Sequence, residues 1–140
     1  MEKPHKKLDV WNMAMQLVTD VYGVSKNFPE KETYGLVNQI RRAAVSIPSN
    51  IAEGAGRQTS KEFIQFLHIA QGSLSELDTQ LEITNRLGVL SQNDWSDLET
   101  TMNRIDKMLS GLIRLKKSPH ALRLTPHDKT QIQPTHKGVK

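Results

Sequence analysis

Two adjacent arginines, Arg41 and Arg42, are the residues whose type and position most directly suggest a chemistry. Each guanidinium group presents a fork of N–H donors that matches the oxygens of a phosphate. Arg42 points away from the apolar face of the helix predicted around it, and Arg41 lies at the border of that face. The alternative, which the frequency of surface arginines favours, is that both pair with carboxylates such as Glu53, Asp78 or Glu82, within or between subunits.

A turn with two glycines, residues 54–60, follows these arginines and leads into another predicted helix. Backbone N–H groups at a helix start can hold an anion, and Arg57 and Lys61 would add positive charge there. The segment lacks the Gly-x-x-x-x-Gly-Lys pattern of a phosphate-binding loop. A plain connection between helices is therefore the simpler interpretation of this turn.

The basic residues are concentrated at the two ends of the chain. The formal net charge is +4 and the isoelectric point is near 9.4. By segment, the charge is +2 over residues 1–7, −3 over residues 8–115 and +5 over residues 116–140, where Lys116, Lys117 and Arg123 lie. Clustered lysines and arginines bind nucleic acid by releasing counterions, without reading its sequence. A tail that only increases solubility would carry the same charge.

Other chemistries find little support. The chain has no cysteine, which excludes disulfides and thiolate ligands and suits a reducing compartment. His68 has no histidine or carboxylate four residues away, and the other four histidines lie in the terminal segments, so we expect no metal site. A nucleophile built from Ser46 or Ser49 with His68 lacks a supporting motif. We therefore expect no enzymatic activity and no cofactor.

Membrane insertion and secretion are also unsupported by the sequence. No apolar run approaches the roughly 20 residues that a helix needs to cross a bilayer. The N-terminal residues are basic and then amphipathic, without the apolar stretch of a signal peptide. We therefore expect a cytoplasmic protein that does not contact a membrane.

Apolar residues recur every three or four positions through residues 8–117, which indicates four amphipathic helices. The first is expected to stop at Pro29, because proline disfavours helix in the residue before it. The second is expected to begin near Pro29 and Glu30, to be kinked at Pro48, and to end at Gly54 and Gly56. Two shorter helices are the alternative for this second segment.

The third helix is predicted over residues 60–88, and the fourth begins after Ser91. A capping box from Thr59 to Glu62 opens the third helix, and Ser91 caps the fourth. The apolar rows of the second, third and fourth helices follow helical spacing, and they comprise Leu36, Ile40, Ala44, Ile47 and Ile51; Phe63, Leu67, Ala70, Leu74, Leu77, Leu81 and Thr84; and Trp95, Leu98, Met102, Ile105, Leu109 and Leu112.

The connections between these helices are short, which makes neighbouring helices antiparallel. We therefore predict an all-α fold, an antiparallel up-down-up-down four-helix bundle over residues 8–117. Residues 1–7 form a basic N-terminal arm. Residues 118–140 contain three prolines and no aromatic residue, so we expect a disordered basic tail there.

The helices carry more apolar residues than one bundle needs. The additional positions lie beside the main apolar rows, and they are Val10, Leu17, Val24, Val45, Ile69 and Ile83. Large exposed apolar patches usually mark an interface, so the pattern favours a homo-oligomer. The alternative is a wide core face within a single bundle.

Several long segments resemble one bacterial protein family. They are NFPE at 27–30, YGLVNQIRRAAVSIPSNIAEGAGR at 34–57, EF at 62–63 and FLHIAQGSLSEL at 66–77, together with the VW pair at 10–11. The sequence resembles the four-helix-bundle family named for proteins encoded in intervening sequences of 23S ribosomal RNA genes. That family is related to the accessory variability determinant proteins of diversity-generating retroelements.

The resemblance covers about residues 8–115 and implies a four-helix protomer that assembles as a barrel-shaped homopentamer. In the retroelement branch the barrel is basic, binds nucleic acid and partners a reverse transcriptase. This chain looks like the intervening-sequence branch, because its body is acidic. Arg41, Arg42 and Arg57 match the motif of the family, without an assigned role there.

Together these observations predict a non-enzymatic, homo-oligomeric bundle that binds RNA or DNA without sequence specificity. The residues expected to contact nucleic acid are Arg41, Arg42, Arg57, Lys61, Lys116, Lys117 and Arg123, with the N-terminal lysines. The alternative is an interaction scaffold or accessory subunit, whose apolar grooves bind a protein partner.

Overall fold

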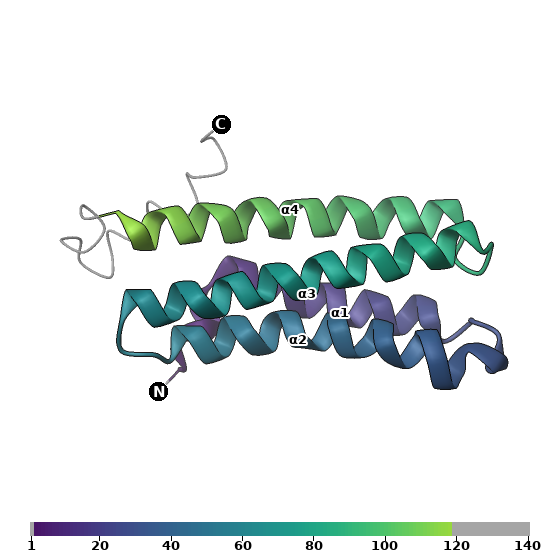
Figure 1. Cartoon of the computed structure of the whole chain (residues 1–140), viewed down its shortest axis with the longest axis horizontal. Helices are drawn as coiled ribbons and strands as arrows, with labels where there is room; N and C mark the ends of the chain where they lie inside the picture. Colours follow the sequence, from purple (N-terminus) through teal and green to yellow (C-terminus); the bar gives the residue numbers. More distant parts are fainter. Residues whose placement is uncertain (1, 119–140) are drawn as a thin grey trace.

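Four long helices build the computed structural model, which describes residues 2–118 apart from the side chains of residues 32–34 (Figure 1). The segment predicted as a disordered tail lies outside the described residues, except for Ser118. The elements are η1 (Pro4–Lys7), α1 (Asp9–Ser25), η2 (Glu30–Glu32), η3 (Thr33–Val37), α2 (Asn38–Ala55), α3 (Ser60–Arg86) and α4 (Gln92–Lys117).

The helices run up, down, up and down, and each of α1 to α4 packs against two others (Figure 1). The start of α1, the α2–α3 turn and the end of α4 therefore lie at the same end of the bundle. No strand occurs in residues 2–118, so the prediction of an all-α four-helix bundle is confirmed.

The predicted apolar rows form the core. All residues of the predicted rows in α3 and α4 are buried, and in α2 the row is buried from Ile40 onward. Leu36 is half-buried against this core. Removing four apolar faces from water is the main driving force for this fold.

The predicted caps of α3 and α4 are confirmed. Thr59 Oγ1 accepts a hydrogen bond from the Glu62 N–H at 3.2 Å, and Ser91 Oγ accepts one from the Asp94 N–H at 3.1 Å. Thr59 also donates to the Glu62 carboxylate at 3.1 Å. Each cap satisfies an N–H that has no partner within its helix, so both starting points are fixed locally.

The connection between α1 and α2 differs from the prediction. The first helix ends at Ser25, because Asn27 and Phe28 donate to carbonyls three residues back in a tighter turn, which lets Phe28 pack against the core. The second helix begins at Asn38 and not near Pro29, since residues 30–37 form a 3₁₀ turn and then a π-helical turn. Gly35 lies in that turn, and glycine weakens the preference for an α-helix.

The alternative of two shorter helices is wrong for the second segment, because α2 is continuous through Pro48. Gly54 was predicted to end this helix, yet it is buried inside the last turn. A Cβ atom at this position would lie 2.7 Å from the Phe66 Cβ and 2.9 Å from the Phe63 Cδ1. Glycine is needed here for the close approach of α3, and Gly56 follows the helix with a φ of −85°.

The additional apolar positions divide into two groups. Val10 and Leu17 are fully buried in the core of their own bundle, and Val24 packs against that core, so a wide core face explains these three. The others, Val45, Ile69 and Ile83, are exposed. The pattern therefore selected buried positions on α1, where Met15 and Tyr22 are the exposed apolar residues, and it identified exposed positions correctly on α2 and α3.

Gly54→Ala should destabilise the protein, because the new methyl group would overlap the Phe66 side chain and the backbone of α3. We expect the free energy of unfolding in urea to fall by about 1–3 kcal/mol.

The matched control is Gly23→Ala in α1, where a Cβ would meet no atom within 4 Å. This variant should gain about 0.5–1 kcal/mol, because alanine favours a helix over glycine. Equal effects of the two substitutions would contradict the close α2–α3 contact.

Candidate nucleic-acid interface

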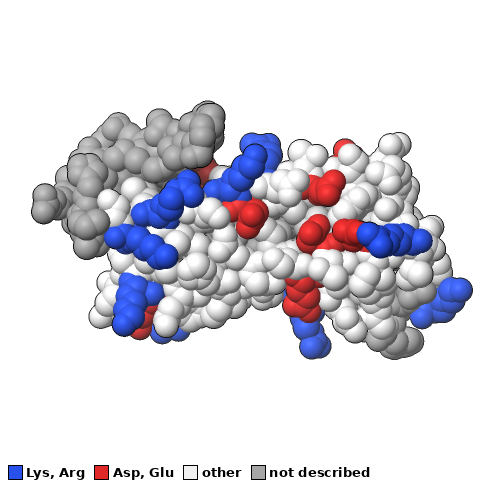
Figure 2. Space-filling view, turned by 45° about the horizontal axis from the view of Figure 1, so that its top comes forward, with Lys and Arg blue, Asp and Glu red and all other residues white. Residues whose placement is uncertain are grey.

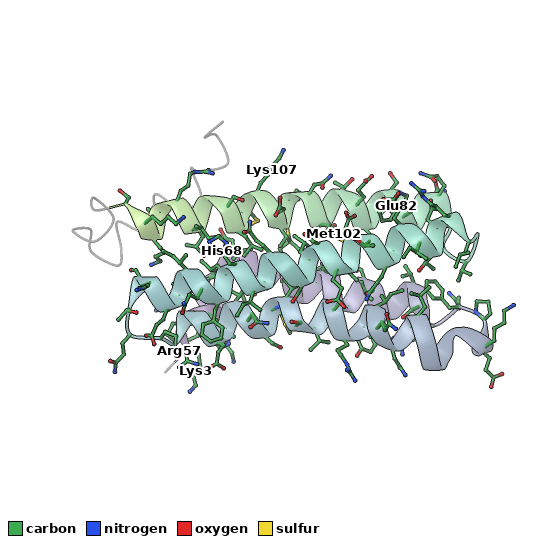
Figure 3. All side chains as sticks on the ribbon, viewed as in Figure 1. Lys3, Arg57, His68, Glu82, Met102 and Lys107 are labelled. Carbon is green, nitrogen blue, oxygen red and sulfur yellow. The ribbon has the colours of Figure 1, made fainter. Side chains whose placement is uncertain are left out.

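Basic side chains from three separate segments meet at the end of the bundle that holds the α2–α3 turn. We call this the basic end, made of residues 2–9, 53–62 and 114–118. Figure 3 shows Lys3 and Arg57 next to each other there, and both line the same cavity. The topology brings these segments together, because an even number of antiparallel helices returns the chain to its starting end.

The basic end carries a net positive charge on a body that is otherwise acidic. It contains eight lysines and arginines against four carboxylates, and the cations are Lys3, Lys6, Lys7, Arg57, Lys61, Arg114, Lys116 and Lys117. In Figure 2 several Lys and Arg lie together toward one end of the face in view, a few lie at the other end and the lower edge, and most Asp and Glu lie over its middle. This uneven distribution focuses positive potential on one end of the molecule.

Two phenylalanines at the start of α3 support cations of this end. The Arg57 guanidinium lies over the Phe66 ring at 4.8 Å, and the Lys116 ammonium lies over the Phe63 ring at 5.4 Å. Arg57 also donates to the Glu53 carboxylate at 2.8 Å, one turn earlier in the chain. These contacts hold two of the cations in defined positions while leaving the surface around them accessible.

A cavity of about 350 Å³ opens between η1 and the end of α2. Its lining comprises Lys3, Pro4, His5, Ala52, Glu53, Gly56 and Arg57. The Glu53 carboxylate and the last carbonyl groups of α2 give this lining a negative component, which disfavours a phosphate inside it. The exposed lysines of η1 and of the first turn of α3 are better placed to contact phosphates than the inside of the cavity is.

The structure places four of the predicted contact residues together. Arg57 follows α2, Lys61 is exposed in the first turn of α3, and Lys116 and Lys117 end α4. Arg123 lies outside the described residues. The sequence pattern missed Arg114, which lies in the same last turn as the two lysines.

Arg41 and Arg42 do not join this group, because both lie near the start of α2, at the opposite end. Arg41 is half-buried, its Nε donates to Ser25 Oγ at 2.8 Å, and its guanidinium lies over the Tyr22 ring at 4.6 Å. Arg41 therefore fastens α1 to α2. Arg42 is exposed on the outer surface of α2.

Within one chain, these arginines do not pair with Glu53 or Glu82. Glu53 pairs with Arg57, and Glu82 pairs with Arg86 at 2.6 Å, each across one helical turn. Within residues 2–118, neither Arg41 nor Arg42 forms an ion pair. Both carboxylates are paired with an arginine four residues later in the chain, Arg57 and Arg86, as is common for side chains one helical turn apart.

The serines considered as nucleophiles make other contacts. Ser46 and Ser73 share a hydrogen bond of 2.7 Å across the α2–α3 contact, and Ser49 donates to the Val45 carbonyl at 2.8 Å. His68 is exposed on α3.

In the part of the chain that the structure describes, no group of three or more His, Asp or Glu residues could hold a metal ion. None of the described helices is long and apolar enough to span a bilayer.

One carboxyl group departs from its ordinary acidity. Partial burial on α3 and, secondarily, the nearby Glu82 carboxylate raise the pKa of Asp78. The folded protein therefore binds this proton more tightly than the unfolded chain does. At neutral pH the ionised Asp78 carboxylate lowers the free energy of unfolding. This destabilisation decreases as the pH falls through the raised pKa of the folded state, and it is absent below the ordinary pKa of an aspartate.

Comparison with known proteins places the chain in a family. A family model described as 23S rRNA-intervening sequence protein matches residues 6–111, most of the chain. The chain belongs to this family. Arg57 and Lys61 lie within the matched region, whereas Lys116 and Lys117 follow it. The search of curated proteins gave no match.

A solved structure shares the fold. It is the crystal structure of a protein of unknown function from the S23 ribosomal protein family of Bacteroides thetaiotaomicron, with a TM-score of 0.69 and 23% sequence identity. The alignment covers 74% of this chain and 97% of that one. At this identity the likeness supports the four-helix fold.

Arg41→Ala should lower the free energy of unfolding by about 1–2 kcal/mol, because the buried Ser25 Oγ loses its charged donor and keeps only its hydrogen bond to the Tyr22 carbonyl, and Tyr22 loses a cation–π contact. Urea denaturation of the variant measures this loss. Arg104→Ala, which removes an exposed arginine from α4, should stay within about 0.5 kcal/mol of the parent protein. A neutral Arg41→Ala would show that Arg41 does not connect α1 to α2.

Asp78→Asn should raise stability at pH 7, because it removes a partly buried charge next to Glu82. The advantage over the parent protein should shrink as the pH is lowered through the raised pKa of Asp78, where the parent carboxyl becomes neutral. Thermal unfolding from pH 7 to pH 3 follows both effects. Asp97→Asn on the exposed surface of α4 is the control, and a similar gain from it would contradict the role of burial.

Proposed function

We propose that this protein is a non-enzymatic, self-associating bundle that binds RNA or DNA through the basic end without sequence preference. The observation that supports this most is the meeting of eight lysines and arginines from three segments on an otherwise acidic body. The proposal extends the predicted role and moves the contact surface away from Arg41 and Arg42.

The binding would depend on phosphate contacts. The exposed lysines of η1, the start of α3 and the end of α4 each reach one phosphate and release its counterions. Such contacts fix orientation but carry no sequence information. Phe63 and Phe66 at the start of α3 lie beneath cations, so these two rings are poorly placed to stack on bases.

Self-association would multiply this weak contact. Exposed Val45, Ile69 and Ile83 support an interface between copies, and the family resemblance suggests a homopentamer. Several basic ends on one assembly convert later contacts into intramolecular ones, which raises the avidity far above that of one protomer. The basic tail, with Arg123, would add charge next to each basic end.

A protein-interaction scaffold is the second candidate function. The same exposed apolar residues favour it, since a helix of another protein could cover them. In that case the basic end would be a solvated surface, and changing its charge would leave partner binding intact. Nucleic-acid binding and its dependence on salt separate the two functions.

Replacing Lys7, Lys61 and Lys117 by glutamine should weaken binding to a generic single-stranded RNA. The slope of log association constant against log salt is negative, and the loss of three phosphate contacts should make it less negative by about 2. The matched control replaces Lys31, Arg104 and Lys107, three exposed cations outside the basic end, and should keep the parent affinity more closely. Fluorescence anisotropy between 50 and 200 mM salt is a suitable measurement.

Truncation after Ser118 tests the tail in the same assay. We expect weaker binding that still depends on Lys7, Lys61 and Lys117. No binding by the full chain at low salt, or affinity independent of salt, would contradict the proposed function. Equal losses in the two triple variants would show that net charge matters and the basic end does not.

A further inference from the structure

The cavity between η1 and the end of α2 combines groups of both charges in a small space. Its volume of about 350 Å³ lies within the range of roughly 300–1,000 Å³ that is typical of small-molecule sites. Lys3 and Arg57 lie next to each other along it (Figure 3). Glu53 adds a carboxylate, and Pro4 and His5 add ring surfaces from η1. An occupant must therefore satisfy a carboxylate and a guanidinium at once.

The η1 side of the cavity is fixed by contacts outside it. Asn12 Nδ2 of α1 donates to the carbonyls of Lys6 and Leu8, at 3.3 and 3.1 Å, which anchors η1 to α1. The His5 ring lies edge-on to the Trp11 ring, with 4.9 Å between the ring centroids. A site whose sides are already in place loses little conformational entropy when it binds a ligand.

The α2 side of the cavity presents hydrogen-bonding groups in a defined order. The Arg57 guanidinium rests on the Phe66 ring at 4.8 Å, and its Nη2 donates to Glu53 Oε2 at 2.8 Å. Both charged side chains remain about half exposed, 41% for Arg57 and 56% for Glu53. Within residues 2–118 no other hydrogen bond uses either side chain, so Glu53 Oε1 and further Arg57 N–H groups are available. The pair therefore offers a donor followed by two acceptor oxygens.

Charge disfavours two kinds of occupant. The Glu53 carboxylate and the last carbonyl groups of α2 repel a phosphate, whereas Lys3, Arg57 and the other lysines of η1 repel a cation. A neutral, planar group with both donors and acceptors avoids both repulsions. A nucleobase is such a group, and a strand held by the basic end would bring its bases close to this cavity.

The order of donor and acceptors favours one base. The Watson–Crick edge of guanine presents an acceptor, O6, followed by two donors, N1–H and the N2 amino group. This edge is complementary to the Arg57 guanidinium followed by the two oxygens of Glu53. Adenine, cytosine and uracil make at most two of these three hydrogen bonds in any alignment, because each lacks two adjacent donors next to an acceptor.

We propose that this cavity binds an unpaired guanine base, with Glu53 and Arg57 on its Watson–Crick edge and Lys3 on the adjoining phosphate. The inference rests on the proposed function, and it adds a preference at a single nucleotide to phosphate contacts that read no sequence. The rings of Pro4 and His5 would cover part of the base. Base pairing uses the same edge, so guanines in loops, bulges and strand ends, or in free nucleotides, are the ones that fit.

Uridine decamers that differ at one central position test this preference. The central base is guanine, adenine or cytosine, and fluorescence anisotropy measures the binding of each decamer to the full chain. The guanine decamer should bind about fivefold more tightly than the other two, because it gains one more hydrogen bond to a charged but half-exposed group.

Glu53→Gln should reduce this affinity ratio to about one, because the amide replaces one acceptor oxygen by a donor group. The matched control is Glu82→Gln, which breaks the corresponding ion pair with Arg86 away from the cavity. Both substitutions remove one negative charge and one contact across a helical turn, so they change the general attraction to RNA equally. The control should keep the preference for guanine.

Guanosine 5′-monophosphate distinguishes a strand from a free nucleotide as the source of the base. Isothermal titration calorimetry at low salt compares it with adenosine 5′-monophosphate on the full chain. A preference for the guanosine nucleotide would support the base site and extend it to free nucleotides. A preference for guanine in the decamers alone would support the site and assign it to nucleic-acid strands.

Two results would overturn the proposal. The first is equal affinity for the three decamers together with no preference between the two monophosphates, which would leave the proposed function intact. The second is a guanine preference that survives in Glu53→Gln, since the base would then bind elsewhere. If the full chain bound no RNA, the proposed function would fail, and the two monophosphates would still decide whether the cavity takes guanine.

Discussion

The contact of Gly54 with Phe63 and Phe66 is the constraint on which much of this structure depends. It brings α2 and α3 so close that a single methyl group on α2 would not fit. The rings of the same two residues also lie under the Arg57 guanidinium and the Lys116 ammonium. The packing of the core and the arrangement of surface cations are therefore connected through two side chains, and a change in one would be felt by the other.

The bundle topology explains why the charge is so unevenly distributed. In the sequence, Arg57 lies 50 residues after Lys7 and 60 residues before Lys117 at the end of α4. The antiparallel arrangement of the helices places them at one end, while Glu82, Asp94 and Asp97 fall toward the other. The small net charge of the whole chain does not show this uneven distribution, because the positive charge of the basic end is partly offset by the negative charge of the rest of the bundle.

Most of the fold could be predicted from the sequence, because helix positions and apolar faces are determined by residues close to one another in the chain. Helical periodicity identified the apolar rows, and Thr59 and Ser91 signalled the starts of α3 and α4. The α1–α2 connection could not be predicted, since its path depends on the burial of Phe28 against distant helices. The position of Gly54 was equally ambiguous, because a glycine that ends a helix and one that permits close packing look alike in a sequence.

The candidate site was predictable in part. Arg57, Lys61, Lys116 and Lys117 were identified by type, but their meeting point required the topology. The role of Arg41 was hidden, since its partner Tyr22 lies nineteen residues earlier on another helix. Valines and isoleucines beside the main rows also looked equivalent in the sequence, and only packing separates the buried Val10 from the exposed Val45.

The return of the chain to its starting end has a practical consequence for laboratory work. An affinity tag or fluorophore fused at the N-terminus, or directly after Ser118 in a truncated chain, would lie next to the basic end and could mask or mimic its charge. The α3–α4 turn around Gly88 lies at the far end of the bundle and is exposed. A cysteine introduced there would give a labelling position that reports on the molecule without obstructing the surface under study.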